Sequence, residues 1–563
     1  MQLSEQEIVR REKLEKLRQL GIDPYPADLY PVSHTSAQIK SNFKPNAKVV
    51  IAGRLMSRRI QGSASFAELQ DSEGRIQVYF NRDEICSTDD KTKYNTVYKK
   101  LLDIGDFIGI EGELFTTKVG EKTVMVKDFT LLSKALKPLP LPKVDADGNV
   151  HDKFDDPELR YRQRYADLVV NPEVKAVFMK RTQLFNAMRQ FFNDAGYFEV
   201  ETPVLQPIPG GAAARPFITH HNSLDIPLYM RIANELYLKR LIVGGFDGVY
   251  EFSKNFRNEG MDRTHNPEFT AMEIYVAYKD YNWMMGFCEN LLEHCAMAVN
   301  GTTKATFGDY NIDFKAPYPR ITMRDAILEH TGFDIYNSSE DDIREAAKNM
   351  GVEIDDTMGK GKLIDEIFGE KCEPHYIQPT FITDYPKEMS PLCKAHRDNS
   401  ELTERFELMV CGKEIANAYS ELNDPIDQRE RFEHQLKLAQ KGDDEATEFI
   451  DFDFLRALEY GMPPTSGMGI GMDRLIMFLT NNQSIQEVLF FPQMRPEKKK
   501  IELSENEKII FEIIKSEKRM DLNDLKSKSG LSNKGWDKGL KGLVKHGLTK
   551  VEKTEEGLFV EMV

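Results

Sequence analysis

Hydrophobic and polar positions between residues 48 and 126 alternate in short runs, which is typical of half-buried β-strands. Turn residues separate these runs, for example at 71–74. The runs cover residues 49–53, 65–69, 75–80, 107–111 and 124–126. Five short strands so close together favour a small barrel of the OB-fold type. We therefore predict an OB-fold domain over residues 46–136.

The segments before and after this region have different residue patterns. Residues 4–20 mix charges with apolar positions at helical spacing and end near Gly21, so 1–45 are predicted to form a helix followed by a proline-broken arm. Residues 137–150 begin with alternating prolines and indicate a stiff linker.

Residues 151–497 form one long block in which helical and strand-like patterns mix. A helical period covers residues 171–193, and residues 323–371 are charged and helical, which suggests an insertion. Strand-like runs lie at 198–204, 228–232, 248–252 and 269–275. The block is long enough to hold a catalytic core.

The last segment, 501–563, has its own pattern. Helical runs at 505–516, 521–529 and 532–546 precede a short β-like end, which is the order of a winged helix. In the third run the lysines fall on one helical face. This face is either simply solvated or a contact for tRNA or a protein, and its residues are Lys534, Lys538, Lys541 and Lys545.

Composition narrows the function classes. The chain has 563 residues, 40% hydrophobic and 29% charged, so we exclude wholesale disorder, a collagen-like chain and a disulfide scaffold. The net charge of −16 argues against a uniformly basic nucleic-acid binder, although local basic patches remain possible. Six scattered cysteines form no CxxC pair, which favours reduced thiols over a zinc site. No apolar run is long enough for a signal or a membrane span, so we expect a cytoplasmic protein.

The densest chemical signal is the run from Asn255 to Gly260 and its continuation to Glu273. A strand, a charged loop and a returning strand would place arginine and glutamate side chains over one surface, where Arg257 could grip phosphate oxygens. Glu259 could accept a hydrogen bond from an adenine amino group. The alternative interpretation is a surface hairpin with ordinary ion pairs.

A second signal is the glycine-rich run from Gly467 to Arg474. It lacks the Gly-Lys-Ser/Thr ending of a P-loop, and its Gly-x-Gly-x-Gly spacing fits a dinucleotide fingerprint poorly. The glycines instead suggest a backbone packed close to a ligand or another element.

A third signal is the spacing of Glu407, Glu414 and Glu421 at intervals of seven residues. Seven is odd, so on one continuous strand successive acids would face opposite sides. A turn at residues 411–413 would give two strands whose acids converge. Converging carboxylates are ligands that Mg²⁺ prefers, usually together with substrate phosphates. Solvated strand acids are the alternative.

These motifs together resemble a known family. The Arg257 run resembles the second signature motif of class II aminoacyl-tRNA synthetases, residues 469–474 resemble the third, and residues 191–203 resemble the first, which supplies the dimer interface in that family. Residues 210–217 and 231–239 are similar to those of the lysyl-tRNA synthetases. The resemblance covers roughly residues 5–497, and the C-terminal segment falls outside the common bacterial pattern.

The resemblance implies an OB-fold barrel and an antiparallel-sheet catalytic core with helices. With the winged-helix-like tail, which is predicted from its own helical pattern, the expected fold class is α+β multidomain. It implies a lysine–tRNA ligase, which forms lysyl-adenylate from L-lysine and ATP, releases pyrophosphate and transfers lysine to the 3′ end of tRNA(Lys). A cytoplasmic homodimer that uses Mg²⁺ is expected.

The family motifs also imply roles for single residues. Arg257 and Arg474 are the catalytic candidates. The implied ATP contacts are Arg257, Glu259, His265, Phe269 and Arg474. The implied lysine contacts are Gly211, Glu235, Arg257, Glu273, Tyr275, Asn417 and Glu421. Glu407 and Glu414 would hold the metal. The implied anticodon contacts are Arg58, Arg59, Phe66, Gln77 and Glu121, with Phe66 as a plain barrel-core residue the alternative.

Three other functions were weighed. Aspartyl- and asparaginyl-type synthetases share the barrel and the motifs, but Glu235 and Glu421 favour a cationic amino acid. Protein-lysylating paralogues lack the barrel predicted here. An inactive RNA-binding scaffold would not need the full set of charged motif residues.

Overall fold

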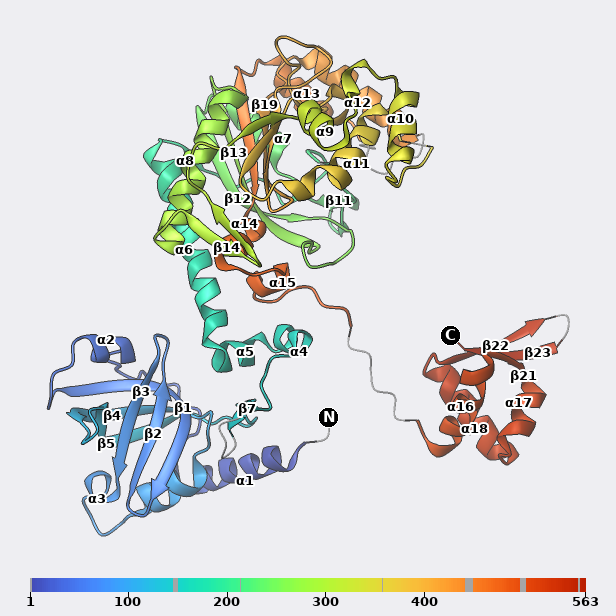
Figure 1. The fold of residues 1–563 in the computed structure, drawn as a ribbon. Helices are drawn as coiled ribbons and strands as arrows, with labels where there is room; N and C mark the ends of the chain where they lie inside the picture. Colours follow the sequence, from blue (N-terminus) through green and yellow to red (C-terminus); the bar gives the residue numbers. More distant parts are fainter. Residues whose placement is uncertain are drawn as a thin grey trace. The chain divides into compact units, whose positions relative to one another are not determined.

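The computed structural model describes residues 3–144, 150–212, 214–356, 358–440, 449–496, 503–554 and 557–562. The chain divides into two compact units, Met1–Pro492 and Gln493–Val563, and each is described by itself. Figure 1 shows the succession of elements along the chain. Within the described residues, no helix is both long and apolar enough to cross a membrane. All six cysteines are free, and five of them are buried.

The N-terminal part is a closed five-stranded barrel, as the alternation predicts. The strands follow the order β1-β2-β3-β5-β4. Their bounds are β1 (Lys48–Gln61), β2 (Ala64–Gln70), β3 (Arg75–Asn81), β4 (Phe107–Thr116) and β5 (Lys122–Ser133). Between β3 and β4 lie α3 (Arg82–Ile85) and a π-helical segment, η1 (Lys93–Leu101). Alternate residues of β2 and β3 fill the barrel interior.

The first helix, α1 (Glu5–Gln19), begins with a capping box between Ser4 and Glu7. Its Leu17 belongs to the barrel core. Arg10 donates hydrogen bonds to the carbonyl oxygens of Ile104 and Ala135, so α1 is fixed to the barrel by polar and apolar contacts. The predicted arm contains a short helix that sequence analysis missed, α2 (Ser36–Ser41). β6 (Lys143–Val144) and β7 (Val150–His151) pair beyond the barrel.

The centre of the catalytic part is an eight-stranded sheet. Its order is β16 (Arg320–Thr322), β17 (Thr380–Thr383), β18 (Arg405–Val410), β19 (Lys413–Ser420), β20 (Thr465–Gly471), β13 (Glu268–Ala277), β12 (Gly248–Phe256) and β8 (Phe198–Glu199). The pairs β16–β17 and β12–β8 are parallel, and the others are antiparallel. The antiparallel core predicted from the motifs is confirmed.

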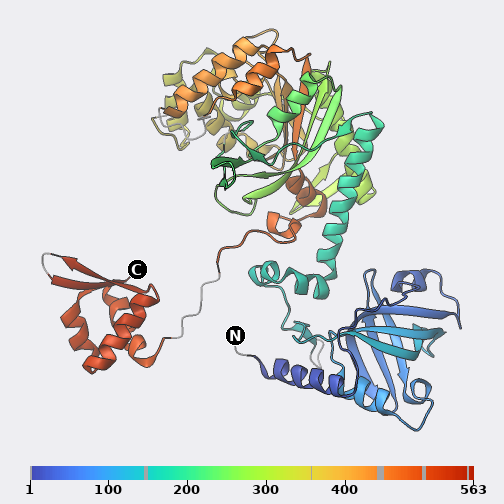
Figure 2. The same cartoon turned by 180° about the vertical axis from the view of Figure 1, so that it is seen from behind.

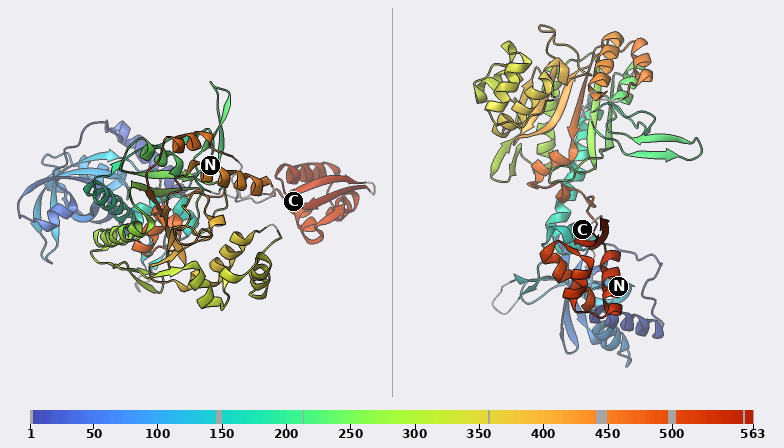
Figure 3. Two further views of the ribbon diagram at one scale, coloured as in Figure 1. Left: turned by 90° about the horizontal axis from the view of Figure 1, so that it is seen from above. Right: turned by 90° about the vertical axis from the view of Figure 1, so that its right-hand side faces the viewer.

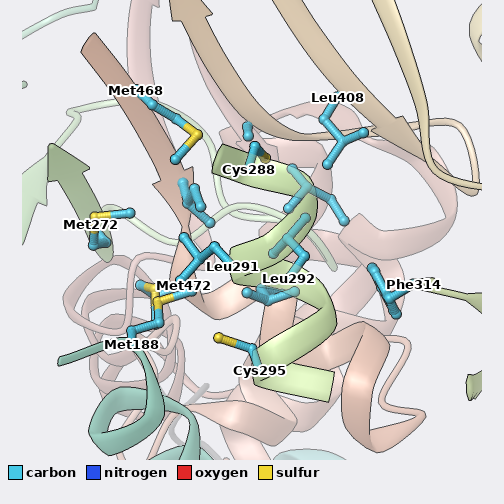
Figure 4. Packing of buried hydrophobic residues seen from close by; sticks show 14 of the residues in the cluster. Met188, Met272, Cys288, Leu291, Leu292, Cys295, Phe314, Leu408, Met468 and Met472 are labelled. Carbon is cyan, nitrogen blue, oxygen red and sulfur yellow. The ribbon is translucent and has the colours of Figure 1, made fainter. Parts of the chain in front are cut away.

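Helices that cover the sheet share its largest hydrophobic core. They are α6 (Pro172–Asp194), α8 (Tyr281–Asn300) and α14 (Met472–Thr480). Figure 4 shows Cys288, Leu291 and Leu292 of α8 among the methionines of neighbouring elements. α4 (Pro157–Arg162), α5 (Arg164–Val170) and α15 (Ile485–Val488) complete this side, and α7 (Glu235–Val243) packs in a second cluster with α12 (Pro425–Gln440) and α13 (Phe452–Glu459).

The predicted insertion at 323–371 is helical. It consists of α9 (Met323–Thr331), α10 (Glu340–Asn349) and α11 (Lys360–Lys371), with a core of its own. Short turns of 3-10 helix follow or separate these helices: η2 (Ile335–Asn337), η3 (Glu373–His375) and η4 (Lys387–Met389). Figure 2 shows these yellow helices at the same end of the core as the orange α12 and α13.

Two small sheets lie beside the main one. β9 (Leu205–Gln206), β10 (Ile218–His221) and β11 (Ile226–Met230) form one, and β14 (Lys304–Phe307) and β15 (Tyr310–Asp313) form the other. The β10–β11 hairpin projects from the core in Figure 3. The strand predicted at 198–204 is wrong in length, because only Phe198–Glu199 pairs in the main sheet.

The second unit contains α16 (Glu505–Glu517), α17 (Leu522–Ser529) and α18 (Asn533–Lys545). A sheet of order β21 (Arg519–Asp521), β23 (Gly557–Met562) and β22 (Thr549–Thr554) accompanies them. Trp536, Leu540 and Leu543 of α18 are buried with Ile510 and Val560 in a separate core. The three helices and the final strands occur in the predicted order, whereas β21, between α16 and α17, was not predicted.

Candidate active site

A cavity of about 1040 Å³ lies over the central strands of the main sheet. Residues from α7, α11, β12, β13, β18, β19 and β20 line it. Twelve of the predicted ligand residues are among the lining: Gly211, Glu235, Arg257, Glu259, His265, Phe269, Glu273, Tyr275, Glu407, Glu414, Asn417 and Arg474. Of the predicted lysine, ATP and metal ligands, Glu421 alone is outside the described lining.

The Arg257 run forms the predicted strand, loop and returning strand. Phe256 on β12 pairs with Glu268 on β13, and the Arg257 amide donates to the Pro267 carbonyl at 2.8 Å across the start of the loop. The Arg257 guanidinium carbon lies 5.1 Å from the centre of the Phe269 ring. Arg257 Nε is buried without a hydrogen-bond partner among the described residues. A buried donor left in this state is one that a bound acceptor would satisfy.

His265 and Arg474 meet at another part of the cavity wall. Arg474 Nη2 lies 3.3 Å from His265 Nε2, and Arg474 Nη1 donates to the Glu414 carbonyl at 2.9 Å. His265 Nδ1 lies 2.8 Å from Asp262 Oδ2. His265 and Glu259 are both exposed at the cavity. Asp262, which orients the histidine ring, was missed in the sequence because it lies outside the motif positions.

The β18–β19 hairpin brings Glu407 and Glu414 together. Its turn is at Cys411 and Gly412, within the predicted turn at 411–413. These two residues have φ values of 49° and 66°. The register shifts between Leu408 and Met409, so that Leu408 faces Ala416 while Met409 faces Glu414. This bulge inserts one residue into β19 and returns Glu414 to the side of Asn417. The predicted convergence therefore needs both the turn and a bulge that the sequence did not show.

The two acids differ in burial, since the side chain of Glu407 is 14% exposed and that of Glu414 is 40% exposed. Burial first, and the nearby charge of Glu414 second, raise the pKa of Glu407 to about 7. Arg405 Nη2 lies 2.5 Å from Glu407 Oε1 and opposes this rise. Two carboxylates that repel one another suit a divalent cation. However, among the described residues no group of three histidine, cysteine or acidic side chains could hold a metal by itself.

The opposite part of the cavity is rich in buried acids and tyrosines. Tyr275 donates to Glu273 at 3.0 Å, and Tyr419 donates to Glu235 at 2.7 Å. Burial and the charge of Glu235 raise the pKa of Glu273 to about 7. Tyr419 was missed, although it lies two residues from Asn417 and therefore shares its face of β19.

Glu421 lies just behind this wall, next to Gly467 and Tyr275. A Cβ atom added to Gly467 would lie 2.2 Å from Glu421 Oε1 and 2.4 Å from Tyr275 Cε1. The glycine-rich run forms strand β20. Because Gly467 has no side chain, there is room beside it for the Glu421 carboxylate and the Tyr275 ring. Both Glu421 carboxylate oxygens are buried, and Oε1 has no partner among the described residues. Glu421 forms an ion pair with Lys239, which sequence analysis missed.

The start of α7 is fixed by a buried network. Arg231 Nη1 donates to Glu251 Oε1 at 2.7 Å, and Asn234 Nδ2 donates to Glu251 Oε2 at 3.0 Å. This network positions Glu235 at the first turn of the helix. Gly211 has a φ of 87°, and a Cβ there would lie 3.3 Å from the Glu235 Cβ, so the Gly211 backbone closely approaches Glu235.

The barrel surface presents a row of aromatic rings. Phe66 faces outward, since the buried residues of β2 are Ser65, Ala67 and Leu69, and its ring centre lies 4.8 Å from that of Tyr79. The alternative prediction of Phe66 in the barrel core is therefore wrong. The ring centre of Tyr79 lies 6.0 Å from that of Phe115. The sequence analysis predicted neither of these two rings at the surface.

The polar residues predicted at this surface differ in their contacts. Gln77 donates to Thr123 Oγ1 at 2.8 Å, and it pairs across the strands with Glu68 on β2, the strand of Phe66. Arg59 and Glu121 are exposed. Arg58 donates to the Tyr98 carbonyl, so its guanidinium also fastens η1 to the barrel.

Comparison with known proteins matches both parts of the first unit. Residues 156–495 match the family of tRNA synthetases class II (D, K and N), and residues 49–132 match the OB-fold nucleic acid binding domain. The chain is 77% identical to a lysine–tRNA ligase of Christiangramia forsetii over 557 residues, which are 99% of this chain and 98% of the relative.

Two further lysine–tRNA ligases are similar over a smaller share of this chain. That of Porphyromonas gingivalis is 70% identical over 503 residues, which are 88% of this chain and 87% of the relative. That of Azobacteroides pseudotrichonymphae is 65% identical over 499 residues, 88% of this chain and 99% of the relative. By these matches, the chain belongs to the class II aminoacyl-tRNA synthetases, within the family of the lysine–tRNA ligases.

Proposed function

We propose that the cavity binds lysine and ATP side by side and that its own residues set the geometry of adenylate formation. The observation that carries this proposal is a pair of unsatisfied buried groups. Arg257 Nε lacks an acceptor, and Glu421 Oε1 lacks a partner among the described residues, while Glu421 Oε2 is paired with Lys239. A lysine molecule supplies both, with a carboxylate at one end and an ammonium at the other.

The lysine contacts divide by charge. Arg257 and Asn417 would bind the carboxylate, and Glu235 with the Gly211 backbone would bind the α-ammonium. Glu421 and Tyr275, with Glu273 beside them, would receive the side-chain ammonium. Supporting this division, acids and phenols line this part of the cavity.

The ATP contacts would use the other end of the cavity. Glu259 would accept from the adenine amino group, Phe269 and Arg474 would enclose the ring, and His265 would lie near the outer phosphates. An oxygen of the lysine carboxylate then attacks the α-phosphorus while the bond to pyrophosphate breaks. Arg257 would neutralise charge on the reacting phosphate, so positioning and charge stabilisation replace a protein nucleophile.

Glu407 and Glu414 are the side chains that would hold Mg²⁺. The pair fits this cation because the acids are close enough for the charge of Glu414 to raise the pKa of Glu407. When bound, Mg²⁺ supplies charge neutralisation to phosphate oxygens. Since protein alone offers too few ligands here, the phosphates would complete the coordination.

The substitution Glu421→Gln tests the lysine site. It removes the charge that would pair with the side-chain ammonium, and breaking a buried ion pair costs roughly 3–5 kcal/mol. We expect the KM for lysine in pyrophosphate exchange to rise at least about 100-fold, with the KM for ATP unchanged. Glu289→Gln, a buried acid on α8 outside the cavity, is the matched control. An unchanged lysine KM in Glu421→Gln would sink the assignment.

For tRNA, we propose that the outer barrel surface stacks anticodon bases. The tilted Phe66–Tyr79 pair offers aromatic faces, Arg59 offers charge, and Gln77 and Glu121 could read base edges. Phe66→Ala is expected to weaken binding of a lysine anticodon stem-loop to the full chain, since base stacking is worth about 1–3 kcal/mol. Equal affinities of the two proteins would contradict this role.

We propose that α18 is a second tRNA contact. Lys534, Lys538, Lys541 and Lys545 are all exposed, and none forms an ion pair with a residue that the structure describes. The face opposite them is buried in the core of the unit. Charge complementarity to phosphate favours RNA over a protein partner.

Relatives indicate that this contact is an addition to the enzyme. The Azobacteroides relative uses 99% of its length to match 499 residues of this chain, and 563 minus 499 leaves 64, about the size of the tail. Replacing the four lysines by glutamine should raise the KM for tRNA several-fold and leave the KM for ATP unchanged. A tRNA KM equal to that of the parent would favour a simply solvated face.

We also propose a cytoplasmic homodimer. Phe198 and Leu205, in and beside the first motif, are 59% and 49% exposed, which would suit an interface. Light scattering should give twice the chain mass, and a monomer mass would refute the dimer.

A further inference from the structure

The ammonium of Lys239 lies between two acids of the proposed lysine site. Its Nζ atom is 2.5 Å from Glu235 Oε1 and forms a second ion pair with Glu421 Oε2. The Lys239 side chain is completely buried. Among the described residues, it is the cation that pairs with Glu421. A lysine of the protein thus contacts both carboxylates that we propose for the two ammonium groups of the substrate.

The position of Lys239 follows from the local fold. Lys239 follows Glu235 by four residues on α7, which places both on one helical face. Glu421 comes from the end of β19 and reaches the same point from the sheet. The aromatic rings of Tyr419 and Phe454 lie 5.5 and 5.9 Å from Nζ, so water is replaced by aromatic faces. A buried ammonium is tolerated here because two acids compensate it.

The charges at this point are interdependent. Burial alone would lower the pKa of Lys239, but the carboxylates of Glu235 and Glu421 outweigh it and raise that pKa. Burial and the charge of Glu235 push the pKa of Glu421 upward, and the ammonium of Lys239 opposes this rise. Lys239 is therefore the group that favours an ionised Glu421 before a substrate arrives.

We propose that Lys239 is a positioning residue for lysine selection, which holds the carboxylates of Glu235 and Glu421 in place for the two ammonium groups of the substrate. This inference rests on the proposed role of Glu421. Lys239 would thus contribute to the choice of amino acid without touching the reacting atoms. It also explains why an acid as deeply buried as Glu421 can serve as an ammonium site.

The first test is Lys239→Met, which removes the charge and keeps the length of the side chain. The KM for lysine in pyrophosphate exchange should rise at least about 30-fold at pH 7, and the KM for ATP should stay unchanged. The matched control is Lys134→Met, because Lys134 is another fully buried lysine between two acids, Asp103 and Asp106 of the barrel. It should leave both KM values unchanged. An unchanged or lowered lysine KM in Lys239→Met would overturn the proposal.

The pH profile separates positioning from a merely structural role. Without Lys239, Glu421 should need a higher pH to ionise, so the fall in lysine KM with rising pH should move up by about one pH unit or more. Other titratable groups face Glu421 and stay in place in the variant: Glu235 from α7, Glu273 and Tyr275 from β13, Tyr419 from β19, and Cys393. A profile that keeps its parental midpoint would contradict the proposal.

A double-mutant cycle decides whether Lys239 acts through Glu421. In Glu421→Gln, adding Lys239→Met should raise the lysine KM by less than about threefold, because the acid that it serves is already neutral. Independent, multiplicative effects would overturn the proposal. If Glu421→Gln alone has no effect, the proposed function fails. If Lys239→Met nevertheless raises the lysine KM, Lys239 acts through Glu235 alone. That result would overturn the proposal that Lys239 serves both acids.

Lys239→Arg keeps the charge and guards against loss of folding. Its planar guanidinium cannot occupy the place of a point-like ammonium between two acids. We expect the lysine KM to rise at least about fivefold without a shift of the pH profile. A lysine KM equal to that of the parent would show that the geometry of the ammonium is unimportant and would overturn the positioning role.

Discussion

Glu273 shows how a single buried charge in this site affects stability. Burial and the charge of Glu235 raise its pKa from the usual 4.5 to about 7. The folded chain therefore binds more protons here than the unfolded chain, so the contribution of Glu273 to stability is complete below pH 4.5 and is lost as the pH rises through 7.

Glu273→Gln should remove this pH dependence. At pH 8 we expect its free energy of unfolding to exceed that of the parent by about 3 kcal/mol, while near pH 4.5 the two proteins should be almost equal. Urea unfolding at both pH values measures the difference. An equal effect at the two pH values would show that titration of Glu273 is not the cause, and Glu353→Gln, at an exposed position, serves as control.

Gly467 determines how much room the lysine end of the cavity has. A Cβ atom at this position would collide with Glu421 Oε1 and the Tyr275 ring. Gly467→Ala should therefore raise the lysine KM at least about tenfold and destabilise the fold by about 1–3 kcal/mol. Gly286→Ala on α8, where nothing lies within 4 Å of the added atom, should leave the lysine KM unchanged. Retained lysine affinity in Gly467→Ala would mean that Glu421 and Tyr275 do not form the binding wall.

At the scale of residues, sequence reasoning found five of the twelve acids that line the cavity, and it missed Lys239 behind the cavity wall. Those five acids stand in motifs, whereas a lysine in the run from Glu235 to Val243 looks like an ordinary solvated helix residue. The one available signal is its distance of four residues from Glu235. The ion pair with Glu421 depends on a contact across 182 positions of the chain (421 minus 239), which local patterns do not contain.

At the scale of elements, the β18–β19 hairpin shows both the strength and the limit of pattern reasoning. A turn at 411–413 was predicted, since the acids could not otherwise converge, and the structure has it at Cys411 and Gly412. The bulge in β19 was not, because strict alternation gives no sign of an inserted residue. The five barrel strands, by contrast, follow directly from period-two burial, which is why their number and order along the chain were predictable.

The hairpin turn predicts stability changes of opposite sign. Cys411 has a φ of 49° and Gly412 a φ of 66°, both in the left-handed region. Cys411→Gly should stabilise the chain slightly or leave it unchanged, because glycine adopts this region without strain. Gly412→Ala should destabilise it by about 1–2 kcal/mol, since its Cβ would also lie 3.2 Å from the Glu373 carbonyl oxygen. Chemical unfolding of both variants measures this, and a stable Gly412→Ala protein would contradict the turn geometry.

At the scale of the whole molecule, net charge proved a poor guide to partners. A sum of −16 suggested that nucleic acid was an improbable partner, yet the family acts on tRNA. Five of the 91 acidic residues lie at the cavity or just behind its wall and have proposed roles there: Glu235, Glu273, Glu407, Glu414 and Glu421. Binding depends on local charge, such as the lysine face of α18, so a total over several domains excludes only a uniformly basic surface.

The separate core of the second unit predicts independent unfolding. Trp536 is buried in that core, and the chain has only one other tryptophan, Trp283 of α8. In Trp283→Phe, fluorescence therefore reports the tail alone, while enzymatic activity reports the catalytic part. Ligands stabilise the unit that binds them, so saturating lysine and ATP should raise the temperature of activity loss by several degrees and leave the Trp536 transition unchanged. If both transitions coincide and shift together, the two units unfold as one, and the proposal that the tail is an addition to a self-sufficient enzyme would have to be abandoned.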